Sequence, residues 1–153
     1  MTIDLVSHFF SYSTKEGKRL VNLFREEIFD EVAKSDLEGL IFTFVWAFNL
    51  ESDKEYVDRI AKKFEDNGGE VFYVELEADL EERLARNKTP HRLAHKPSKR
   101  NLEWSENDLK SSVEKYRLNS LPGEIQKEKY VKIDNANLSP AEVATMIKDT
   151  FKM

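Results

Sequence analysis

The residues with the clearest chemical potential lie in one basic segment, Arg83–Arg100 (RLARNKTPHRLAHKPSKR). It carries seven of the 24 lysines and arginines and no Asp or Glu, while the other 17 bases share the rest of the chain with all 29 acids. Such a concentration of positive charge attracts phosphate groups. Residues 79–85 predict the start of a helix, which Pro90 and Pro97 interrupt. The pattern predicts an arginine-bearing lid over a phosphoryl group, at about residues 87–104, although a solvated basic loop would have the same composition.

The sequence gives little indication of a metal site or of a cysteine or serine nucleophile. His91 and His95 are four apart, a spacing that binds a metal on a helix, but prolines flank them and no carboxylate partner is evident. We therefore predict no metal site. The absence of cysteine excludes disulfides, thiolate nucleophiles and cysteine zinc sites. No serine stands in a GxSxG turn, so a serine hydrolase is not indicated.

Length and composition predict one soluble domain over residues 1–153. Apolar residues make up 40% of the chain and charged residues 35%, which is typical of a globular protein. The first ten residues have no basic flank, and no apolar stretch approaches the ~20 residues of a membrane span. These features predict a cytoplasmic protein without a membrane partner. A net charge of −5 argues against bulk nucleic-acid binding.

Hydrophobic periodicity predicts an alternation of helices and strands. Helices are expected at residues 3–10, from Ser13, from Ser52, from Asp79, from Ser105 and from Ser139, and strands at 40–48, 71–76 and 130–133. In the first strand, LIFTFVWAF, only Thr43 is polar, so both of its faces should be buried, as in an interior parallel strand. Strands separated by helices form parallel sheets with right-handed crossovers. The expected fold is a three-layer α/β/α domain.

Two stretches, DLEERLARN…PHRL and VKIDNANLSPAEV, together with this order of elements, resemble the P-loop small-molecule and nucleotide kinases. The similarity is greatest to the shikimate-kinase-like and adenylate-kinase-like branch, and it covers nearly the whole chain. It implies a P-loop NTPase-like fold that uses ATP and Mg²⁺. It also implies phosphoryl transfer to a small hydroxylated or phosphorylated acceptor.

The resemblance assigns roles to basic and loop residues. Arg86 matches the arginine that lies against the adenine of ATP, and Asn135 and Ala136 fall in the loop around the adenine edge. Arg92 matches a lid arginine that closes on the transferred phosphoryl group. Arg100 could assist it, together with Lys96 and Lys99. In phosphoryl transfer the protein mainly positions groups and neutralises charge, a task that suits the fixed fork of arginine.

Five further residues are candidates for the acceptor side: Asp4, His8, Arg25, Trp46 and Asn49. The first three fall where related kinases hold the acceptor. A packed turn explains His8 equally well, and a surface salt bridge is the simpler explanation of Asp4 and Arg25. Trp46 and Asn49 end the predicted strand at 40–48, the edge at which open α/β sheets bind ligands. Trp46 is also compatible with plain core packing.

The sequence departs from the family at its N-terminus. No glycine begins or ends a GxxxxGK[ST] loop, and the strand, phosphate loop and helix that open the family's fold are absent. We expect that Met1 is an internal methionine of a longer protein. The alternatives are that the strands close up, or that a homo-oligomer completes the sheet. The chain alone should then bind ATP poorly and transfer no phosphoryl group. The alternative function is a non-catalytic module whose basic segment binds phosphates of RNA or of a partner protein.

Overall fold

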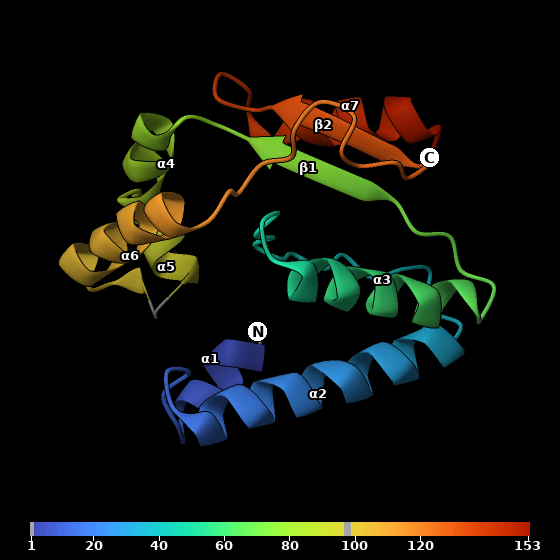
Figure 1. Cartoon of the computed structure of the whole chain (residues 1–153), viewed down its shortest axis with the longest axis horizontal. Coiled ribbons are helices and arrows are strands. Elements are labelled where there is room, and N and C mark those ends of the chain that lie inside the picture. The colour runs from blue at the N-terminus through green and yellow to red at the C-terminus, as the bar shows by residue number, and fades with distance from the viewer. Residues whose placement is uncertain (1, 97–98) are drawn as a thin grey trace. The chain divides into compact units, whose positions relative to one another are not determined.

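The computed structural model describes residues 2–96 and 99–153. It is a mixed α/β structure, mostly helical with a small parallel sheet (Figure 1). In the described part, the elements are α1 (Thr2–Ser7), α2 (Lys15–Lys34), α3 (Glu51–Glu65), β1 (Tyr73–Glu77), α4 (Leu80–Asn87), α5 (Pro90–His95), α6 (Leu102–Lys115), β2 (Tyr130–Asp134) and α7 (Pro140–Phe151). No helix of this part is long and apolar enough to span a membrane.

Two compact units can be distinguished in the chain, and the single domain stays a prediction. The first unit comprises Met1–Phe44 and Tyr56–Glu70, and the second comprises Val45–Glu55 and Val71–Met153. In the first unit α1 packs against α2, whose N-cap is Thr14 rather than the predicted Ser13. The Thr14 side chain accepts a hydrogen bond from the Gly17 backbone. Val21 and Phe29 are buried along α2 and form the centre of this unit.

The predicted buried strand at residues 40–48 is wrong. Within the described residues, this segment forms no strand ladder, and Ile41 is 93% exposed while Val45 is 71% exposed. A nearly continuous apolar run indicates burial, but a strand also requires a ladder of backbone hydrogen bonds with a neighbour. The end of this run makes a backbone hydrogen bond, from Phe48 N to the Arg117 carbonyl at 2.8 Å, which does not amount to a ladder. Phe42 of this run packs against Phe29, with ring centres 4.9 Å apart in an edge-on arrangement.

The second unit contains the sheet. β1 and β2 pair in parallel, from Tyr73 opposite Tyr130 to Glu77 opposite Asp134. The predicted strands at 71–76 and 130–133 are therefore confirmed to within two residues, and so is their parallel direction. Figure 1 shows α7 beside β2, and Val143 of α7 and Ile133 of β2 are both buried. The sheet has two strands in the described residues, so the three-layer arrangement stays a prediction.

Four N-caps were predicted in the second unit, and the structure confirms two of them. The Ser139 capping box with Glu142 is confirmed, and Asp79 caps α4 by accepting from the Glu82 backbone. The predicted start at Ser105 is wrong, because Asn101 caps α6 four residues earlier and Ser105 is buried inside the helix. The predicted cap at Ser52 is also wrong, since α3 begins at Glu51.

The predicted lid at 87–104 is partly helical. Thr89 caps the short helix α5, and Pro90 occupies its first turn, where a missing N–H costs nothing. Pro90 therefore begins a helix instead of leaving a loop. Pro97 lies outside the described residues.

Candidate functional site

The Arg86 guanidinium is held by four hydrogen bonds. Its Nε donates to Glu82 Oε1 at 2.6 Å, one turn earlier on α4. Nη1 donates to Asn135 Oδ1 at 3.1 Å, and Nη2 donates to the carbonyl oxygens of Asn135 at 2.5 Å and Ala136 at 3.0 Å. The structure thus brings together three residues that the sequence had grouped, across a separation of 49 and 50 positions.

Local structure on both sides sets this arrangement. Glu82 and Arg86 are four apart on α4, so their side chains meet on one face. On the other side the backbone of Asn135 donates to Glu77 O and that of Ala136 to Asp134 Oδ1, which fixes the loop after β2. The contacts of Arg86 lie along the edge of the guanidinium, and its side chain is 37% exposed. A planar cation with its edge occupied still offers a flat face to a ring.

Arg92 contacts a buried polar pair. Its Nε donates to Asn87 Oδ1 at 3.1 Å. The Asn87 amide, 2% exposed, meets the hydroxyl of Ser105, 1% exposed, through Nδ2 at 3.0 Å and Oδ1 at 3.2 Å. These three residues come from α5, α4 and α6, so a single buried amide joins three helices.

Several basic residues of the Arg83–Arg100 segment are paired. Lys88 forms an ion pair with Glu106 at 2.8 Å, and Lys99 forms one with Asp108 at 2.9 Å. Arg100 donates from Nε to the Leu93 carbonyl at 3.0 Å. Acids of α6 therefore lie against the basic segment and reduce its local field, which the linear sequence does not indicate.

The predicted acceptor residues divide between the two units. Asp4, His8 and Arg25 belong to the first unit, where Arg25 Nε donates to Thr2 Oγ1 at 3.2 Å and its guanidinium lies 5.8 Å from the Phe42 ring centre. These contacts give Arg25 a structural role between α1 and α2. Asp4 is half-buried and His8 is exposed at the end of α1.

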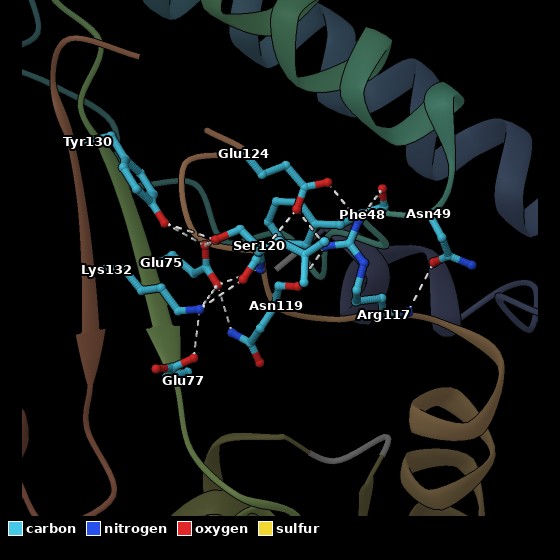
Figure 2. Close-up of polar contacts among 11 residues, drawn as sticks. Phe48, Asn49, Glu75, Glu77, Arg117, Asn119, Ser120, Glu124, Tyr130 and Lys132 are labelled. Atoms are coloured by element: carbon cyan, nitrogen blue, oxygen red, sulfur yellow. Dashed lines mark hydrogen bonds and ion pairs between the residues drawn. The ribbon is translucent and has the colours of Figure 1, made fainter. Parts of the chain in front are cut away.

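Trp46 and Asn49 belong to the second unit and have structural contacts there. The Trp46 ring stacks on Phe48 at 4.7 Å between centres. Asn49 accepts from the Arg117 backbone at 3.0 Å and donates to the Lys115 carbonyl at 3.4 Å (Figure 2). These bonds make Asn49 an anchor for the end of α6.

A network around Glu75, which the sequence analysis did not single out, lies on the polar face of the sheet (Figure 2). Its carboxylate accepts four hydrogen bonds: from the Ser120 backbone at 2.9 Å, Ser120 Oγ at 2.6 Å, Asn119 Nδ2 at 2.8 Å and the Tyr130 hydroxyl at 2.8 Å. The Lys132 ammonium is 3.5 Å away. The sequence feature that could have indicated this network is Glu75 itself, a carboxylate between Val74 and Leu76. It lies on the charged face of a strand, where it must find polar partners.

The network predicts a strong pH dependence of stability. Burial on its own would raise the pKa of Glu75, but the hydrogen bonds from Ser120, Asn119 and Tyr130 outweigh it and lower the pKa from 4.5 to about 2. The folded state therefore gains stability above pH ~4.5 that is lost as the pH falls toward 2. The expected loss is about 3 kcal/mol. About 2 kcal/mol of this loss falls between pH 6 and pH 3, where urea unfolding measures it, and in a Glu75→Gln variant the difference between the two pH values should be smaller by that amount.

Among residues 2–96 and 99–153, no three His, Asp or Glu side chains are grouped to hold a metal ion. The His91 and His95 rings stack 4.2 Å apart, and His95 Nδ1 lies 2.8 Å from the His91 carbonyl oxygen. The pair is thus engaged within α5.

Comparison with known proteins gives no match: no protein-family model, no curated protein and no solved structure is similar to this chain.

Proposed function

We propose that the second unit provides the adenine-binding and lid part of an ATP-dependent phosphotransferase that acts on a small molecule. In this proposal Arg86 lies against the base, and Asn135 and Ala136 line its edge. Arg92 and Arg100 stabilise charge on the phosphoryl group. The three-layer P-loop kinase arrangement is the corresponding fold proposal, and the parallel β1–β2 pair would form part of its sheet.

The observation that carries the proposal is the Arg86 arrangement. Glu82, Asn135 and Ala136 occupy the guanidinium edge, so an incoming anion would find few in-plane donors. What remains is the flat face of a fixed cation, which binds a planar aromatic base better than it binds a phosphate. Stacking of one base on such a surface contributes about 1–3 kcal/mol.

The lid assignments rest on the chemistry of arginine. The hydrogen bonds described for Arg92 and Arg100 both use Nε. Their terminal nitrogens would supply paired N–H donors to a phosphoryl oxygen. In phosphoryl transfer the Mg²⁺ that accompanies ATP neutralises charge on the phosphates, and lid arginines add to this.

The 153 residues contain no GxxxxGK[ST] loop, which is the main phosphate contact in this class of enzyme. These residues alone should therefore bind ATP with a dissociation constant of about 1 mM or weaker. They should transfer no phosphoryl group. Phosphoryl transfer by this chain would contradict the proposal.

Substitution of Arg86 tests the role of its face. We expect Arg86→Lys, which keeps the charge but removes the planar face, to weaken ATP binding about fivefold or more, as measured by NMR titration. Arg83→Lys on the same helix is the matched control and should leave the affinity unchanged. Equal affinities of the Arg86→Lys and Arg83→Lys proteins would show that the base does not lie on Arg86.

The alternative, a phosphate-binding module for RNA or a partner protein, requires an open basic surface. The ion pairs of Lys88 with Glu106 and of Lys99 with Asp108 do not favour it. Its signature would be affinity that falls steeply with salt, in proportion to the number of phosphates contacted.

A further inference from the structure

The buried pair of Asn87 and Ser105 has no evident reason to be polar if its only task is to fill the space between α4 and α6. Two apolar side chains of similar size would pack there without the cost of burying an amide and a hydroxyl. In the described part of the chain, the side-chain hydrogen bond from this pair to another residue is that of Asn87 Oδ1, which accepts from Arg92 Nε at 3.1 Å. The hydrogen bond to Arg92 therefore explains why the pair is polar.

We propose that Asn87 and Ser105 are positioning residues that fix the Arg92 guanidinium in place for an anion before the anion arrives. Ser105 Oγ meets both atoms of the Asn87 amide and so holds the plane of the amide. Arg92 Nε can only donate, so Oδ1 rather than Nδ2 faces α5, where it accepts from Arg92 Nε. The hydrogen bond at Nε determines the plane of the guanidinium.

The ligand class follows from the donors that remain. With Nε bonded to the protein, Nη1 and Nη2 present two N–H groups side by side, a geometry that matches two oxygens of a phosphoryl group. A long, mobile side chain loses rotamer freedom when it binds a ligand, at a cost of about 0.5–1.5 kcal/mol. A side chain that is already ordered avoids this cost, which corresponds to a factor of about two to ten in affinity. The identity of the ligand as a phosphoryl group rests on the proposed function. The ordering of the Arg92 side chain by Asn87 and Ser105 does not.

The first test needs no ligand. In the ¹⁵N-labelled chain, the heteronuclear NOE of Arg92 Nε should be close to that of backbone amides. It should fall toward the value of an exposed arginine such as Arg19 in Ser105→Ala and Asn87→Ala proteins. Ser112→Ala is the matched control, because Ser112 is on the same helix and donates to the Asp108 carbonyl instead. A mobile Arg92 Nε in the unsubstituted protein, or one that stays rigid in both variants, would overturn the inference.

The second test uses pyrophosphate as the probe anion. Ser105→Ala should weaken its binding at Arg92 about two- to tenfold, while Ser112→Ala leaves it unchanged. If the buried substitutions prevent folding, Arg92→Lys tests the same contact from the arginine side. It keeps the charge and the buried pair, and should lower pyrophosphate affinity by the same factor. Unchanged affinity in Ser105→Ala or Arg92→Lys would refute the role in anion binding. Failure of adenosine to bind at Arg86 would instead contradict the proposed function and leave a rigid Arg92 unaffected.

Discussion

Replacement of Glu75 by alanine is expected to destabilise the second unit by about 3–5 kcal/mol, because it removes one partner from a mostly buried charged network. The Glu75 side chain is only 10% exposed. Its loss leaves the Ser120 hydroxyl, the Asn119 amide and the Tyr130 hydroxyl without their main acceptor. The Lys132 ammonium also loses one of its two neighbouring carboxylates.

Glu77→Ala is the matched control for this substitution. Glu77 is on the same strand and the same face, but its side chain is 37% exposed and pairs with Lys132 at 2.8 Å. A partly exposed ion pair contributes about 1 kcal/mol or less. Urea unfolding of the two variants, followed by circular dichroism, gives both values. Similar losses in the two variants would mean that the Glu75 network is not an organising feature of the unit.

Phe29→Ala is expected to cost the first unit about 3–5 kcal/mol, the usual range for truncating a buried phenylalanine. Phe29 is 3% exposed, and its ring contacts those of Phe42 at 4.9 Å and Phe64 at 6.4 Å between centres. Removing the ring opens a cavity between α2, α3 and the segment that holds Phe42. Hydrogen exchange of the α2 amides measures the loss within this unit.

The control for Phe29 lies on the same helix. Phe24 is 38% exposed, so Phe24→Ala should cost about 1 kcal/mol or less. If Phe24→Ala accelerated exchange as much as Phe29→Ala, Phe29 would not be at the centre of the first unit.

The sequence predicted well those features that depend on local chemistry. The capping box at Ser139, the Asp79 cap and the strand at 130–133 each follow from a few adjacent residues. It failed at Leu40–Phe48, because apolar composition says that a segment can be buried but not whether a partner strand is present. It also misplaced the start of α6, where Asn101 and Ser105 are both plausible caps and tertiary burial of Ser105 decides between them.

The roles given to the candidate-site residues stay predictions. Arg86, Asn135 and Ala136 were grouped by resemblance, and the structure places them in contact. Asn49, predicted as an acceptor residue, accepts a hydrogen bond from the Arg117 backbone. The Glu75 network and the Asn87–Ser105 pair were missed because their partners lie 45 and 18 positions away in the sequence. No local sequence pattern indicates contacts between residues so far apart in the chain.

The most direct measurement compares ATP with tripolyphosphate, which carries the phosphates without the base, in NMR titrations of the ¹⁵N-labelled chain. The account predicts that ATP shifts the amide signals of Asn135 and Ala136 and the Arg86 Nε signal, and that tripolyphosphate leaves them in place. Tripolyphosphate shifts at Arg86, Asn135 and Ala136 as large as those from ATP would contradict the account, because the ligand would then be recognised by its charge and not by its base.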